Sequence, residues 1–154
     1  QLTFHLRDNV TFHSGNPLSS ADVIWSMRRV LHLNLAQASV WKSYGFTKEN
    51  VDLMITAPDA HTVVIRLPKP NDPKLVLYSL AALGSMVVLD SKTVQAQAEN
   101  NDWGNRWLTT HEAGSGPFRL DVWQAKDVLR ISRDANYWRG ATKQTRGEFR
   151  HLQE

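Results

Sequence analysis

The sequence predicts an α+β fold built from a mixed small sheet with hairpins and several helices. Three observations predict it. The amino terminus alternates apolar and polar residues with the period of two of a half-buried strand. A capped amphipathic helix follows, and two later segments carry hairpin signals. The length of 154 residues and the 42% apolar content fit one folded domain and exclude disorder.

The first hairpin is expected to be centred near Asp8. Alternation runs from Leu2 to Arg7 and resumes at Val10 and Phe12 after the turn residues Asp8-Asn9. The clearest helix is expected at 19–33, because Ser19 can cap it and apolar residues recur there at helical spacing.

The rest of the chain divides at its turn residues. Residues 34–50 show no periodicity and are expected to be irregular. A second hairpin is expected around Pro58–His61 and a third near Lys126. The remaining expected elements are strands at 51–57, 62–67, 118–124 and 128–133, an apolar helix at 74–83, and polar helices at 91–99 and 102–109.

Composition excludes several classes of protein. The net charge is +3, but the basic residues are scattered and only Arg28-Arg29 are adjacent, so no nucleic-acid partner is expected. Cysteine is absent, which removes disulfides, thiolate metal sites and cysteine nucleophiles. The longest uncharged stretch, Leu75 to Leu89, is shorter than the ~20 residues of a transmembrane helix.

Three motifs occur in a fixed order along the chain. An aromatic-x-Leu-Arg strand, a Gly-x-Pro-Leu turn and a capped helix occupy Thr3–Val23. The tract Gly114–Phe118 reads Gly-Ser-Gly-Pro-Phe, and Asn136–Gly140 reads Asn-Tyr-Trp-Arg-Gly. In these motifs the chain resembles the periplasmic solute-binding proteins of the peptide/nickel ABC-transporter family, extracellular solute-binding family 5. Ser115 stands where that family usually has Thr, a mild departure.

This resemblance implies a fold, a location and a function. It implies a partial periplasmic-binding-protein-like II fold, with residues 1–154 as a single lobe of a two-lobed protein and the second lobe absent. It implies the substrate-binding component of an ABC importer, periplasmic or, in a Gram-positive, tethered outside the membrane. The ligand would be a peptide or similar small solute, bound by lobe closure and delivered to an ABC permease in the membrane. No cofactor and no catalytic residue are expected.

Two alternatives to a transport protein are considered. A ligand-sensing domain of a regulator could have the same fold. A hydrolase would need a nucleophile elbow between strand and helix, whereas Ser115 is followed by Gly116, Pro117 and a strand. That tract is instead interpreted as a tight turn with glycines at positive φ.

The candidate ligand-binding residues are Trp41, Tyr44, Gly84, Ser85 and Met86. Trp41 and Tyr44 lie in the irregular segment, and loop aromatics on a rigid scaffold often line ligand sites. The resemblance adds that the family has a cleft aromatic in this region. The tract 84–86 follows the apolar helix, where glycine would let backbone approach a peptide. The alternatives are a satellite core for the aromatics and a helix C-cap for Gly84.

The histidines and tryptophans suggest no further site. In the expected first hairpin, His5 and His13 share one polar face, which gives too few ligands for a metal. His111 beside Glu112 is equally isolated, so no metal is expected. Trp103 and Trp107 are one helical turn apart and are expected to form the buried face of a short helix.

Overall fold

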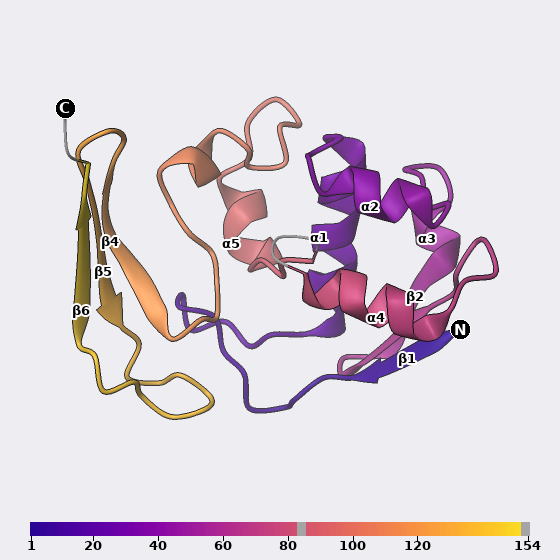
Figure 1. Ribbon diagram of the computed structural model, residues 1–154, viewed down its shortest axis with the longest axis horizontal. Helices are drawn as coiled ribbons and strands as arrows, with labels where there is room; N and C mark the ends of the chain where they lie inside the picture. Colours follow the sequence, from indigo (N-terminus) through magenta and orange to yellow (C-terminus); the bar gives the residue numbers. More distant parts are fainter. Residues whose placement is uncertain (83–85, 152–154) are drawn as a thin grey trace. The chain divides into compact units, whose positions relative to one another are not determined.

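The computed structural model describes residues 1–82 and 86–151 and divides into two compact units (Figure 1). Unit 1 contains residues 1–8 and 19–91, and unit 2 contains residues 9–18 and the chain from 92 onward. Each unit holds a three-stranded antiparallel sheet accompanied by short helical segments, so the predicted α+β class is confirmed. Among the described helices, none has the length and apolar character needed to cross a membrane.

The sheet of unit 1 has the strand order β1-β3-β2. Its strands are β1 (Leu2–His5), β2 (Ile55–Asp59) and β3 (Thr62–Ile65). The antiparallel pairing of β2 with β3 confirms the predicted hairpin around Pro58–His61.

The predicted hairpin centred near Asp8 is wrong. Strand β1 pairs instead with β3, so that Phe4 lies opposite Val63 and not beside the segment that follows Asp8. Residues 9–18 belong to unit 2, where Thr11 forms an isolated bridge with Pro17. The distant pairing wins because it places Leu2, Phe4 and Leu6 against the hydrophobic core of unit 1, which alternation alone cannot locate.

Helix α1 (Ser20–His32) agrees with the predicted helix. Ser19 is its N-cap, and the Asp22 carboxylate accepts hydrogen bonds from both the N–H and the hydroxyl of Ser19, each at 2.9 Å. Val23, Met27 and Leu31 recur on the buried side of the helix and pack into the core of unit 1. That core covers the sheet through contacts of α1 with β2 and β3.

Three shorter helices complete unit 1. The segment expected to be irregular contains α2 (Ala38–Ser43), and the expected strand at 51–57 begins with α3 (Val51–Met54) before β2. Both corrections involve short helices whose stability comes from packing rather than from a long periodic pattern. Helix α4 (Pro73–Ala81) has Asp72 as its N-cap, with the side chain accepting from the Lys74 N–H at 2.8 Å.

Unit 2 contains the second sheet, in the order β4-β5-β6. Strands β4 (Phe118–Gln124) and β5 (Val128–Arg133) confirm the third hairpin, and Lys126 in its turn has a φ of 64°. Strand β6 (Arg146–Arg150) was not predicted. The predicted helix at 91–99 is shorter, α5 (Ser91–Ala96).

The predicted helix at 102–109 is largely absent. Only the 3-10 turn η1 (Trp107–Thr109) forms, because Asn101, Trp103 and Gly104 have positive φ and interrupt the helix. The two tryptophans therefore do not form one buried helical face. Trp107 instead stacks on His111 with ring centroids 4.6 Å apart.

Candidate functional site

The predicted site residue Trp41 lies in the core of unit 1. Its side chain is 1% exposed and meets the Phe46 ring edge to face, with centroids 5.5 Å apart and an interplanar angle of 88°. Helix α2 carries Trp41, and the Phe46 N–H bonds back to the Trp41 carbonyl at 3.2 Å. Trp41 thus belongs to the main hydrophobic core of unit 1 rather than to a satellite core, and its role in ligand binding stays a prediction.

Tyr44 ends α2 and joins it to α4. Its hydroxyl lies 2.6 Å from the Ser79 hydroxyl and donates to the Leu75 carbonyl at 3.2 Å. The ring is half-buried against the core. These contacts place Tyr44 beside α4, and Leu80 of that helix lines the pocket described next.

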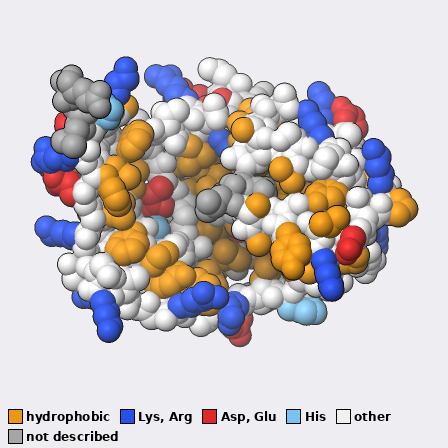
Figure 2. Space-filling view, in the orientation of Figure 1, with side chains coloured by type: hydrophobic (Ala, Val, Ile, Leu, Met, Phe, Trp, Pro, Cys, Tyr) orange, Lys and Arg blue, Asp and Glu red, His pale blue; other side chains and the backbone are white. Residues whose placement is uncertain are grey.

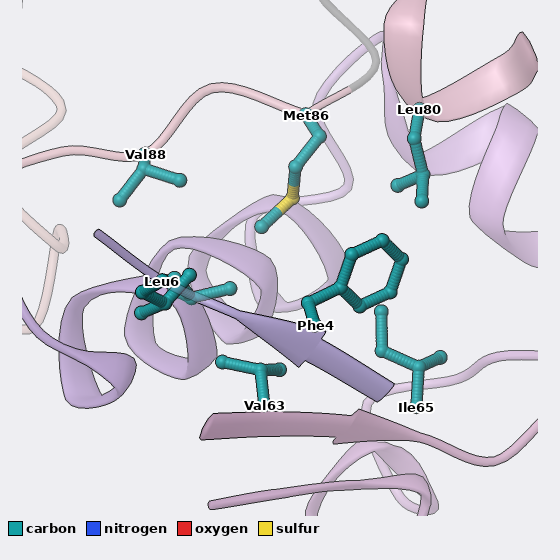
Figure 3. Close-up of a pocket in the computed structure, with 8 residues that line it drawn as sticks. Phe4, Leu6, Val63, Ile65, Leu80, Met86 and Val88 are labelled. Atoms are coloured by element: carbon teal, nitrogen blue, oxygen red, sulfur yellow. The ribbon is translucent and has the colours of Figure 1, made fainter. Parts of the chain in front are cut away.

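An apolar pocket of about 230 Å³ opens between β1, β3, α1 and α4. Met86 lines it, so one of the predicted site residues faces a cavity. Figure 3 shows Met86 and Leu80 on one side of the pocket, with Phe4, Val63 and Ile65 opposite. The complete lining is Phe4, Leu6, Val23, Val63, Ile65, Leu80, Met86 and Val88. Gly84 and Ser85, also predicted to contact ligand, lie outside the described residues.

The lining of the pocket defines the groups that it can accept. All eight side chains are aliphatic, aromatic or thioether groups, so they offer no charged partner. A buried ion or amide would lose its hydration without gaining hydrogen bonds from them. An alkyl or aromatic group is the chemistry that fits, and the flexible Met86 can adapt to its shape.

The surface of α4 is also apolar. Leu75, Leu77 and Tyr78 are exposed, Tyr78 by 72%. Figure 2 shows hydrophobic side chains gathered over this helix. Together with Leu80 on the same helix, they give this part of unit 1 an apolar character that extends beyond the pocket.

Most of the lining was missed by the sequence analysis. Alternation in β1 correctly indicated a buried face with Phe4 and Leu6, but the strand was paired with the wrong segment. The pocket forms because β1 and β3 are neighbours in space, although they are about sixty residues apart along the chain. The signal available in the sequence was the apolar face of each alternating strand, which holds Phe4 and Leu6 in one strand and Val63 and Ile65 in the other.

Elsewhere on the surface, hydrogen bonds lower the pKa of carboxyl groups. The His61 backbone N–H, at 2.8 Å, lowers the pKa of the Asp59 carboxyl. Hydrogen bonds from Arg130 and Arg150 lower the pKa of Glu148. None of these groups lines the pocket. Among the described residues no cluster of three or more His, Cys, Asp or Glu could hold a metal.

The expected pairing of His5 with His13 is wrong, because the two residues belong to different units. Glu112 is likewise not isolated, since the His13 ring contacts it at 2.6 Å. The predicted positive φ at Gly114 and Gly116 is also wrong, since neither has that conformation. The chain bends at Gly116 and Pro117 before it enters β4, so the predicted tight turn is not formed as such.

Comparisons with known proteins agree with this fold. The sequence profile described as bacterial extracellular solute-binding proteins, family 5 Middle, matches residues 1–154. The Escherichia coli protein described as "Probable D,D-dipeptide-binding periplasmic protein DdpA" is 32% identical over 137 residues, 89% of this chain and 24% of that protein. The periplasmic oligopeptide-binding protein OppA of Salmonella typhimurium is 24% identical over 151 residues, covering 90% and 26%.

Solved structures show the same fold. The murein tripeptide binding protein MppA of Escherichia coli has a TM-score of 0.74 at 25% identity, over 97% of this chain and 30% of that one. NikZ of Campylobacter jejuni, in complex with Ni(L-His), has a TM-score of 0.74 at 20% identity, over 97% and 27%. The chain therefore spans about a quarter of the length of the curated relatives it matches.

Proposed function

Since the chain belongs to family 5 of the bacterial extracellular solute-binding proteins, we propose that it is part of the substrate-binding component of an ABC importer. The family consists of binding proteins, so the proposed role is capture of a solute without covalent chemistry. Relatives are named as dipeptide-, oligopeptide- and glutathione-binding proteins. A peptide or similar small solute is accordingly the proposed ligand, and a membrane permease the proposed recipient.

The observation that carries this proposal is the match of the family profile over residues 1–154. A likeness in fold also supports it. That likeness covers 97% of the chain, and the protein concerned is named a murein tripeptide binding protein. The relatives named periplasmic support a location outside the cytoplasmic membrane. In this proposal, residues 1–154 are a single lobe, and the ligand is enclosed when a second lobe closes on it.

The pocket of unit 1 supports a preference within the peptide class. A side chain with an alkyl or aromatic group would lose water and contact Phe4, Leu80 and Met86 there. A charged side chain would find no partner in the same place. We therefore propose that the ligand carries at least one apolar group that enters this pocket.

Calorimetry of the full-length protein that carries this chain tests the function. The titrants are a panel of di- to pentapeptides in which one position varies between Leu, Phe, Ser, Lys and Glu. Stoichiometric binding of peptides with Leu or Phe, weaker for Lys and Glu, is the expected result. Growth on the bound peptide as sole nitrogen source, lost when the permease gene is deleted, would establish import. Absence of binding across the whole panel would reject the peptide class.

A further inference from the structure

Helix α4 supplies one wall of the pocket in unit 1 and has one fully buried side chain. Of its nine residues, all of which the structure describes, only Val76 is buried, whereas Leu75 and Tyr78 are exposed. Leu80 is half-buried, and Figure 3 shows its side chain pointing from the helix toward Phe4. The position of Leu80, and with it the width of the pocket, therefore depends on what else fixes α4 in place.

The Tyr44 hydroxyl makes two hydrogen bonds to this helix. It donates to the Leu75 carbonyl at 3.2 Å and lies 2.6 Å from the Ser79 hydroxyl. Because a hydroxyl has one proton and that of Tyr44 goes to Leu75, the Ser79 hydroxyl is the donor in the second bond. Leu75 and Ser79 are four residues apart, so they lie one above the other on the same side of α4. Tyr44 thus holds this side of the helix at two successive turns.

Tyr44 itself is held by the core and not by α4. It ends α2, and its ring packs against the hydrophobic core of unit 1. Its N–H donates to the Trp41 carbonyl at 3.1 Å, and the Phe46 N–H donates to the same carbonyl at 3.2 Å. Both neighbouring aromatic side chains are almost completely buried. The hydroxyl is therefore a fixed point against which α4 is aligned.

Val76 and the Tyr44 hydroxyl restrain different motions of α4. A single buried side chain fixes one point of the helix on the core and leaves the helix able to swing about that point. Leu80 is four residues beyond Val76, about 6 Å along the helix axis, so such a swing moves Leu80 relative to Phe4. Ser79 directly precedes Leu80, and its bond to Tyr44 opposes the swing.

We propose that Tyr44 is a positioning residue that fixes Leu80 at the pocket and thereby sets how strongly the pocket selects an apolar group. The inference rests on the proposed function, in which such a group of the ligand enters this pocket. Tyr44 acts through α4, because its proton already bonds to the Leu75 carbonyl. Without the hydroxyl, Leu80 moves about, and an apolar group of the ligand loses part of its contacts. A ligand with a polar group in the same place gains nothing from Leu80 and is bound as before.

Calorimetry of the full-length protein with the same peptide panel tests this role. The quantity compared is the ratio of the dissociation constants of the Ser-containing and the Leu-containing peptide. Tyr44→Phe keeps the ring, and the ratio should fall about three- to tenfold, the equilibrium effect of one lost neutral hydrogen bond. The affinity for the Ser-containing peptide should stay unchanged. Tyr78→Phe, which removes the hydroxyl of a 72% exposed tyrosine on the same helix, is the matched control.

Two variants at Ser79 test the same contact from the other side. Ser79→Ala removes the second hydrogen bond to Tyr44 and should lower the ratio in the same direction as Tyr44→Phe. Ser79→Thr keeps a hydroxyl at this position and should preserve the wild-type ratio. A ratio that is unchanged in Ser79→Ala would overturn the assignment of the Tyr44–Ser79 contact.

Hydrogen–deuterium exchange of the unliganded full-length protein separates positioning from general stability. In Tyr44→Phe, the amides of residues 79–82 should exchange faster, while those of α1 and β3 keep their wild-type protection. Loss of protection in all three segments would show that Tyr44 stabilises the unit as a whole, which would refute the positioning role.

The binding results also distinguish this inference from the proposed function. Failure of the wild type to bind any peptide of the panel would reject the proposed function and, with it, the role of Tyr44 in selectivity. Wild-type selectivity that persists in Tyr44→Phe would overturn the role of Tyr44 alone. Equal weakening of the Leu- and Ser-containing peptides would assign Tyr44 to a direct ligand contact, and this outcome overturns the proposal as well.

Discussion

The Asp22 carboxylate joins the first turn of α1 to Ser91, sixty-nine residues later in the chain. Its Oδ1 accepts from the Ser91 hydroxyl at 2.6 Å and from the Ser91 N–H at 3.0 Å. Its Oδ2 accepts from the N–H and hydroxyl of Ser19. Asp22 is only 5% exposed, so this carboxylate replaces water for four donors at once.

Replacing Asp22 should therefore be costly. We expect Asp22→Ala to lower the free energy of unfolding by about 3 kcal/mol, because buried donors lose a charged acceptor. Urea titration followed by circular dichroism measures it. Asp52→Ala is the matched control, since Asp52 pairs with Arg28 on the surface and should cost less than about 1 kcal/mol. Equal effects of the two substitutions would contradict the importance assigned to the buried carboxylate.

Two glycines of unit 2 should differ in how much stability is lost when each is replaced by alanine. Gly104 has a φ of 66°, and an added Cβ would lie 2.3 Å from Val94 Cγ1. Gly116 lacks a positive φ, and nothing lies within 4 Å of its added Cβ. Gly104→Ala should cost about 3 kcal/mol through strain and overlap, whereas Gly116→Ala should change stability by less than about 0.5 kcal/mol.

The same urea titration compares the two glycine variants. A loss of stability in Gly116→Ala as large as that in Gly104→Ala would show that the bend before β4 needs glycine. Tolerance of Gly104→Ala would show that Val94 and the turn can relax around the added methyl group.

Local patterns predicted the elements whose residues are close in sequence. Helix α1 and the hairpins β2–β3 and β4–β5 followed from capping, periodicity and turn residues. The partner of β1 did not, because β3 is distant in sequence and any strand with matching alternation satisfies the local pattern. Helix α2 was also not predicted, because six residues make too few helical turns for the helical period of apolar residues to be visible.

The sequence predicted a residue of the candidate site only where the local pattern around that residue was enough to indicate it. Met86 was identified from its place after the apolar helix, and it does line the pocket. Phe4 and Ile65 were missed because their closeness depends on the β1–β3 pairing. His13 and Glu112 were examined as separate residues for the same reason. Contacts between distant segments decide which residues line the pocket.

Filling the pocket should weaken the binding of ligands with apolar groups. We expect Met86→Trp to place an indole in the cavity and to weaken binding of Leu- or Phe-containing peptides at least tenfold, about 1.4 kcal/mol. Val87→Trp is the matched control, because Val87 is exposed and does not line the pocket. Calorimetry on the full-length protein measures both. Unchanged affinity in a stable Met86→Trp protein would exclude the pocket as the place of the apolar group.

The last prediction is that residues 1–154 alone bind the solute weakly. The chain spans about a quarter of the length of its relatives, so most of such a protein lies outside it. Ligand pockets bury about 70–90% of a ligand's surface, and an isolated lobe leaves one side of the ligand in water. Association and ordering cost several kcal/mol, which the contacts of one lobe barely offset.

Calorimetry of this chain against di- to pentapeptides should show no dissociation constant below about 100 μM, about −5.5 kcal/mol. The full-length protein, titrated in parallel with the same peptides, is the positive control. Stoichiometric micromolar binding by the isolated chain would refute the single-lobe proposal and place a complete site within these residues.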